Sequence, residues 1–89
     1  MTQAEWIYDS MMGDLETPMP GIEDEFAEGK ICERLYREIY EANLELCRRL
    51  GREEDADVEK IINNFFEMNR LLCVHMYHYG VRDGLRLAR

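Results

Sequence analysis

The sequence predicts an all-α protein, in which a short N-terminal helix precedes a long antiparallel helical hairpin that dimerises into a four-helix bundle. Two observations lead to this prediction. Apolar residues recur with the 3.6-residue period of a helix from Val58 to the end of the chain, and proline is absent after Pro20. The 89 residues are 46% hydrophobic and 34% charged, which indicates a globular chain rather than a disordered one.

The first helix is expected at about residues 3–12. Thr2 and Glu5 have the spacing of a capping box, in which each side chain accepts a hydrogen bond from the backbone N–H of the other residue. Gly13 suits the left-handed position that ends a helix. Residues 13–22 are expected to form a connector, because their two prolines are incompatible with a regular helix.

The second helix is expected at about residues 23–50 and the third at about residues 54–88, within a single helical domain 1–89. Acidic residues open the second helix, where they complement the positive end of its dipole. Gly51 ends it, and the short connection predicts that the two long helices lie antiparallel. The residues of the third helix expected to pack against the second are Phe65, Leu72, Met76 and Tyr79.

A second apolar stripe on the third helix predicts a second neighbour. A lone hairpin would leave aromatic side chains of both helices in water, forming a larger apolar patch than soluble monomers usually show. A second copy of the chain would cover that patch. Two glycines four residues apart would permit close approach of helices. The residues expected at this subunit contact are Phe66, Cys73, Tyr77, Gly80, Gly84, Tyr36 and Tyr40.

The net charge of −8 is concentrated at the start of the chain, since residues 1–30 carry eight acids and one base. This balance argues against nucleic-acid binding, which needs Lys and Arg to neutralise phosphates. It suits a partner with a basic surface, or solubility alone. An alternative function is a small nucleic-acid-binding regulator that uses Arg82, Arg86 and Arg89, although cations also suit the C-terminal end of a helix.

Cysteine usage and hydropathy predict the compartment. Cys32, Cys47 and Cys73 are odd in number and lack CxxC spacing, which predicts free thiols in a reducing compartment. The first ten residues lack the apolar core of a signal peptide. No run approaches the roughly 18 apolar residues of a membrane span. We therefore expect a cytoplasmic protein without membrane contact.

The two ends of the chain resemble a known family. The C-terminal segment Tyr77–Leu87 has an aromatic residue, glycine, an apolar residue, a polar pair, glycine and a terminal Arg-Leu pair. The turn Gly13–Pro18 is similar to the Gly-x-Ile-x-Pro-like turn of the same family but has one extra residue. The chain thus resembles the DUF6809-type family of small helical proteins of unknown function from Firmicutes and their phages. The middle matches only in its charged helical character. The resemblance implies an intracellular bacterial or phage-borne helical protein and transfers no catalytic residues.

A metal site formed by one chain is not expected. His75 and His78 are three residues apart on a helix and could share a metal ion. Cys73, however, lies about 160° from His75 around the helix, so the three side chains cannot meet at one ion. Zinc would need further ligands from another chain.

A second alternative function is an enzyme. Glu38, Glu41, Glu54 and Asp57 have the spacing of the acidic motif in Mg-dependent all-α nucleotide pyrophosphohydrolases, which hold Mg²⁺ between two adjacent helices. The expected hairpin opposes this assignment, because Glu41 would lie opposite about position 62, far from Glu54.

The sequence therefore predicts a non-enzymatic, homodimeric helical protein that acts through protein contacts. The expected partners are a second copy of the chain and a protein with a basic or helical surface. No catalytic residue, metal ligand or cofactor is assigned.

Overall fold

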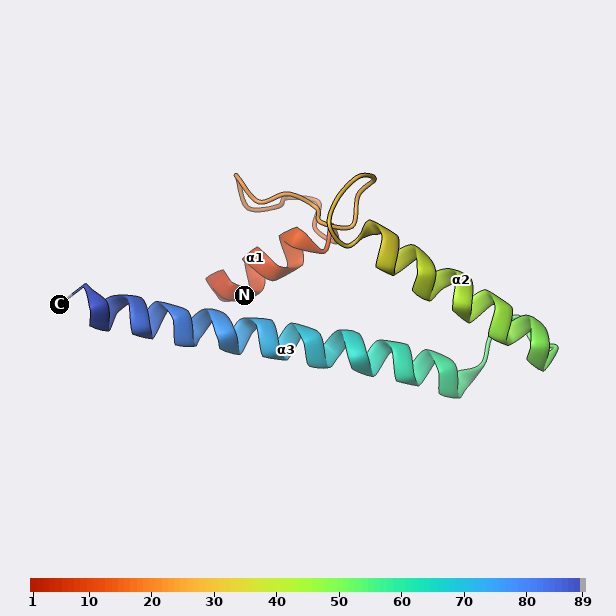
Figure 1. The fold of residues 1–89 in the computed structure, drawn as a ribbon. Coiled ribbons are helices and arrows are strands. Elements are labelled where there is room, and N and C mark those ends of the chain that lie inside the picture. Colours follow the sequence, from red (N-terminus) through yellow and green to blue (C-terminus); the bar gives the residue numbers. More distant parts are fainter. Residues whose placement is uncertain (89) are drawn as a thin grey trace.

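The computed structural model describes residues 1–88 and contains three helices (Figure 1). They are α1 (Gln3–Met11), α2 (Glu33–Leu50) and α3 (Ala56–Leu87). No strand occurs within the described residues. The all-α class predicted from the helical period is confirmed.

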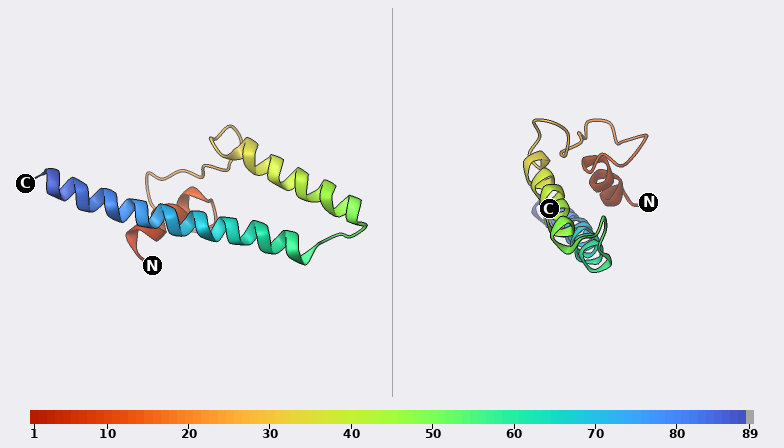
Figure 2. Two further views of the ribbon diagram at one scale, coloured as in Figure 1. Left: turned by 60° about the horizontal axis from the view of Figure 1, so that its bottom comes forward. Right: turned by 90° about the vertical axis from the view of Figure 1, so that its right-hand side faces the viewer.

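Helix α3 forms the long axis of an elongated molecule that measures 60 × 24 × 21 Å. Helix α2 runs back along α3 from a short connection and diverges from it with distance (Figure 1). Helix α1 lies beside the middle of α3, and an end-on view places it to one side of the other two helices (Figure 2). The C-terminal part of α3 extends beyond α1 and α2.

The capping box of α1 forms as predicted. The Thr2 hydroxyl accepts from the Glu5 N–H, and a Glu5 carboxylate oxygen accepts from the Thr2 N–H, both at 3.2 Å. Ser10 is only 2% exposed and links the helix to the connector, which in the structure comprises residues 12–32 between α1 and α2. Its hydroxyl donates to the Trp6 carbonyl at 2.6 Å and accepts from the Met19 N–H at 2.9 Å. Helix α1 and the start of the connector therefore fold onto each other.

Helix α2 begins at Glu33, and the prediction of a helix from about residue 23 was wrong in its first part. Residues 23 and 24 have no regular structure, and residues 25–32 form turns and bends. Gly29 adopts a φ of +81°, a left-handed conformation that interrupts a helix. Helix α2 ends at Leu50, and Gly51 follows it in a left-handed conformation with a φ of +68°. The Asp55 side chain then caps α3.

The chain by itself buries few apolar side chains. Among the described residues, Ala4, Tyr8 and Cys47 are the buried apolar ones, whereas eighteen large apolar side chains are exposed. Because α2 diverges from α3, the predicted packing of α3 against α2 was wrong for the single chain. The four residues expected in that contact are exposed: Phe65 at 66%, Leu72 at 66%, Met76 at 76% and Tyr79 at 56%.

Candidate functional site

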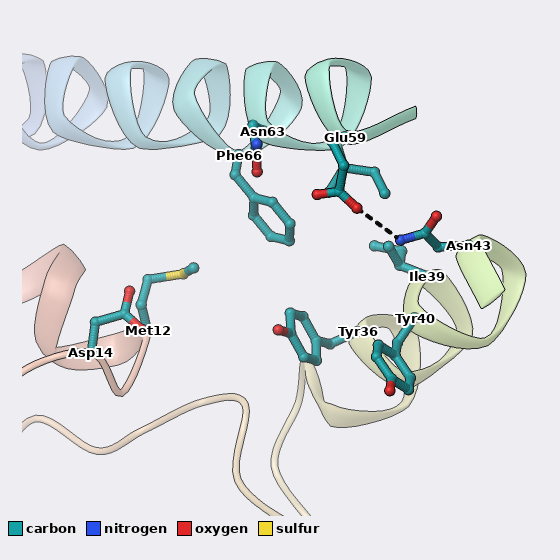
Figure 3. Close-up of a pocket in the computed structure, with 10 residues that line it drawn as sticks. Met12, Asp14, Tyr36, Ile39, Tyr40, Asn43, Glu59, Asn63 and Phe66 are labelled. Atoms are coloured by element: carbon teal, nitrogen blue, oxygen red, sulfur yellow. Dashed lines mark hydrogen bonds between the residues drawn. The ribbon is translucent and has the colours of Figure 1, made fainter. Parts of the chain in front are cut away.

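A groove lies where α2 and α3 diverge, and the end of α1 closes one side of it (Figure 3). Its volume is about 490 Å³. Most of its wall comes from facing residues of α2 and α3. The lining residues are Met12, Asp14, Tyr36, Ile39, Tyr40, Asn43, Glu59, Ile62, Asn63 and Phe66.

Aromatic contacts border the groove at the end farther from the α2–α3 connection. The Tyr36 ring of α2 lies 5.4 Å from the Phe26 ring of the connector, measured between centroids, in an edge-to-face arrangement. The same ring lies 6.2 Å from the Phe66 ring of α3. The connector, α2 and α3 are thus joined through one aromatic side chain, and the groove opens between this contact and the α2–α3 connection.

A polar contact joins the two helices nearer their connection. The Asn43 amide donates to a Glu59 carboxylate oxygen at 3.4 Å, and the Cys47 thiol lies 3.4 Å from the Asn43 amide oxygen. Glu59 and Asp14 are the charged residues that line the groove, and both are acidic. The groove therefore offers apolar and aromatic side chains together with two acidic side chains.

A second hollow continues the groove along α3. Its volume is about 390 Å³, and its lining is apolar except for Asn69. Ile39, Ile62 and Phe66 line both hollows. The two hollows therefore form one continuous apolar surface between the long helices.

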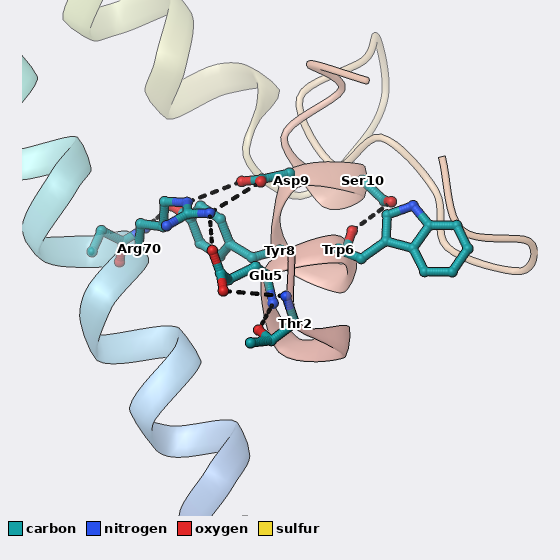
Figure 4. A network of polar contacts seen from close by, with 8 residues as sticks. Thr2, Glu5, Trp6, Tyr8, Asp9, Ser10 and Arg70 are labelled. Atoms are coloured by element: carbon teal, nitrogen blue, oxygen red, sulfur yellow. Dashed lines mark hydrogen bonds and ion pairs between the residues drawn. The ribbon is translucent and has the colours of Figure 1, made fainter. Parts of the chain in front are cut away.

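The second distinctive cluster joins α1 to α3 (Figure 4). Arg70 of α3 donates through Nε and a terminal nitrogen to the two carboxylate oxygens of Asp9, each at 3.1 Å. It also donates to Glu5 at 3.1 Å. Hydrogen bonds from Thr2 and then from Arg70 lower the pKa of Glu5 to about 2. The hydrogen bonds with Asp9 and Glu5 raise the pKa of Arg70 further above its usual value.

Tyr8 completes this cluster. Its ring is buried at 6% exposure, and its hydroxyl accepts from the Asn69 amide at 3.0 Å. Burial raises the pKa of Tyr8, with the Asn69 hydrogen bond acting in the opposite direction. Helix α1 is thus docked by one buried ring and one arginine with two carboxylate partners.

The predicted subunit-contact residues fall in three places. Tyr36, Tyr40 and Phe66 line the groove. Cys73 and Tyr77 are half-buried, on the part of α3 that lies beside α1. Gly80 and Gly84 lie farther along α3, and a Cβ atom added at either would meet no described atom within 4 Å beyond the adjoining turns of the helix. Their role between subunits stays a prediction.

The structure also locates the residues of the alternative functions. Glu38 pairs with Arg34 on α2 at 3.3 Å, Glu41 is exposed on the same helix, Glu54 lies in the connection and Asp57 in the first turn of α3. Across residues 1–88, no three His, Cys, Asp or Glu side chains are grouped closely enough to hold a metal ion, and this includes Cys73, His75 and His78.

The C-terminal arginines make local contacts. Arg82 and Arg86 both approach the Asp83 carboxylate, at 3.2 and 3.7 Å. The Arg82 guanidinium also lies 4.8 Å from the centroid of the Tyr79 ring. Arg89 lies outside the described residues.

Sequence reasoning missed the cluster around Arg70. A signal was present, since Glu5 and Asp9 are four residues apart on α1 and flank Tyr8. Arg70 is also the one Lys or Arg residue between Lys60 and Arg82. Neither pattern indicates that these segments meet.

Within residues 1–88, no helix combines the length and apolar character needed to cross a membrane.

Comparisons with known proteins found no relative of this chain. No family model matches the chain, and no curated protein or solved structure matches it.

Proposed function

We propose that the chain is a non-enzymatic homodimer that acts through protein contacts. In this arrangement the α2–α3 pairs of two copies form a four-helix bundle. The observation that carries the proposal is the apolar stripe of α3, which remains exposed along most of the helix, from Ile61 to Leu87. Soluble monomers rarely expose contiguous apolar surface on this scale.

The total accessible surface supports this proposal. A compact monomer of 10.6 kDa would expose about 5,500 Å², whereas this chain exposes 7393 Å². The excess of about 1,900 Å² on each of two copies corresponds to an interface of about 3,800 Å², within the range of obligate homodimers. The radius of gyration is 16.6 Å, against about 12 Å for a compact chain of this length.

The proposed contact combines two surfaces. The first contains the aromatic residues of the groove, together with Cys73, Tyr77, Gly80 and Gly84. The second is the stripe that the single chain leaves exposed, which includes Phe65, Leu72 and Met76. Burying both surfaces would supply the apolar core that the single chain lacks.

The biological setting is also a proposal. We infer a cytoplasmic bacterial or phage protein of the DUF6809 type from the terminal segments and the free cysteines. A further partner would carry a basic or helical surface, because the connector and the start of the chain are acidic.

Absolute molar mass by light scattering, measured over a concentration series, tests the dimer. We expect twice the chain mass of 10.6 kDa at micromolar concentration. Leu72→Asp should shift the mass toward the monomer, because it places a charge in the proposed contact. The matched control is Glu67→Asp, at an exposed polar position of the same helix. A monomer at high micromolar concentration would refute the proposal.

A further inference from the structure

The groove has an apolar lining and a negative edge, and these properties restrict what can fill it. Its charged lining residues are both acidic. Close to it, the segment 53–59 carries five acids and no base. An occupant that matches this surface is an elongated apolar segment with positive charge.

The C-terminal segment of α3, residues 79–88, has these properties. Val81, Leu85 and Leu87 are exposed, and the segment carries Arg82 and Arg86 against one acid. Within residues 1–88, no atom outside the adjoining turns of the helix lies within 4 Å of a Cβ built at either of its two glycines. This segment extends away from the rest of the molecule (Figure 1), so it cannot reach the groove of its own chain.

An antiparallel pair of α3 helices would place this segment at the groove of a second copy. If two α3 helices pair antiparallel with full overlap, Val81 of one copy lies opposite Ile62 of the other, and Gly84 lies opposite Glu59. These are groove residues. The arginines of each C-terminal segment then lie near the acidic segment 53–59 of the other copy. A parallel pair would instead place acids beside acids and arginines beside arginines, which is unfavourable.

We infer that the groove between α2 and α3 is the binding site for residues 79–88 of a second copy, with the two α3 helices antiparallel. This inference rests on the proposed homodimer and specifies its orientation. Each groove is incomplete without the other chain. The glycine face of the segment permits its backbone to approach the lining closely. The two-fold symmetry of the dimer repeats this contact, so that each copy fills the groove of the other.

Distances between spin labels test the orientation in the full-length chain. Single cysteines at Lys60 and at Leu71, both exposed, would be labelled after Cys32, Cys47 and Cys73 are replaced and dimerisation is confirmed. In the antiparallel pair, the two Lys60 positions are separated by about 35 Å along the axis, whereas the Leu71 positions lie almost level. A Lys60 distance much longer than the Leu71 distance supports the inference.

Other outcomes separate the inference from the proposed function. Similar short distances at both positions in a stable dimer would mean parallel helices. The inference would then be wrong although the dimer stands. A monomeric molar mass without any measurable coupling between labels would overturn both.

A pair of variants tests the occupant itself. Leu85→Asp should raise the dimer dissociation constant by about tenfold or more, because it places a charge in an apolar groove. Leu44→Asp is the matched control, since Leu44 is exposed on α2 and does not line the groove. Equal dissociation constants for the two variants would show that residues 79–88 do not occupy the groove.

Discussion

Arg70 and Asp9 lie 61 positions apart in the sequence and form a two-point ion pair, with two nitrogen–oxygen distances of 3.1 Å. This pair fixes both the position of α1 and its rotation about its own axis, because a planar guanidinium donates two parallel hydrogen bonds to a carboxylate in one orientation. Glu5 adds a second carboxylate to the same arginine. The docking of α1 therefore depends strongly on one side chain of α3.

Replacing Arg70 should loosen α1 while leaving the long helices intact. Arg70→Lys keeps the charge but loses the two-point geometry, so it should weaken the docking less than Arg70→Ala does. Hydrogen exchange of the α1 amides should accelerate in the same order, with little change in the amides of α2. Equal exchange rates in both variants and the natural chain would show that the arginine does not hold α1.

Acid should weaken the docking of α1 in a defined pH range. The folded-state pKa of Glu5 is about 2, below its ordinary value of 4.5. Its stabilising contribution is therefore fully present above about pH 4.5 and is lost as the pH falls toward 2. Trp6 fluorescence, which reports on α1, should change in this range. Glu5→Gln should remove the part of the pH dependence that Glu5 contributes, and identical titrations would contradict this assignment.

The Tyr8 hydroxyl should make a measurable contribution to folding. Tyr8→Phe leaves the Asn69 amide without its partner, at an expected loss of about 1 kcal/mol in the free energy of unfolding. The control is Glu41→Gln, at an exposed position of α2 that does not line the groove. Urea unfolding at one protein concentration compares the two, since dimerisation would otherwise alter the result.

Two glycines should respond in opposite ways to alanine. Gly13 has a φ of +74°, and a Cβ atom there would collide with the Asp24 carboxylate. Gly13→Ala should therefore destabilise the fold by about 1 kcal/mol or more. Gly84 is helical with open space around it. Alanine is favoured over glycine within a helix by about 1 kcal/mol, so Gly84→Ala should raise the helix content of the monomer. Circular dichroism during thermal unfolding distinguishes the two effects.

A larger side chain at Gly84 tests its role between subunits. Gly84→Leu should weaken dimerisation while helicity is kept, because the side chain would hold the second copy away. Light scattering and far-ultraviolet circular dichroism report the two quantities separately. Unchanged association would leave the glycine without a function in the contact.

Local features of the fold were predictable because each depends on residues close in sequence. The capping box at Thr2 and the helix end at Gly51 follow from the hydrogen-bonding side chain and from the missing Cβ. The period of apolar residues likewise predicted the long third helix. The start of α2 was less predictable, because the acids at 23–28 suit a helix and the left-handed Gly29 interrupts it.

The arrangement of the helices was harder to predict. The stripe containing Phe65, Leu72 and Met76 has the period of a core face, but its period does not identify the neighbour that covers it. Within one chain that neighbour is not α2, and α1 instead occupies the side of α3 that carries Arg70. The path of the connector contributes to this outcome, because its Phe26 contacts Tyr36 of α2, and the same Tyr36 ring contacts Phe66 of α3.

The distance in sequence between Asp9 and Arg70 has a consequence for synthesis on the ribosome. Helix α1 emerges first, but the arginine that holds it is added 61 residues later, a delay of about 3–12 s at ordinary rates of translation. Throughout that interval Tyr8 has no hydrophobic surface to cover it. A nascent chain of this protein should therefore keep α1 accessible to chaperones until most of α3 has been made.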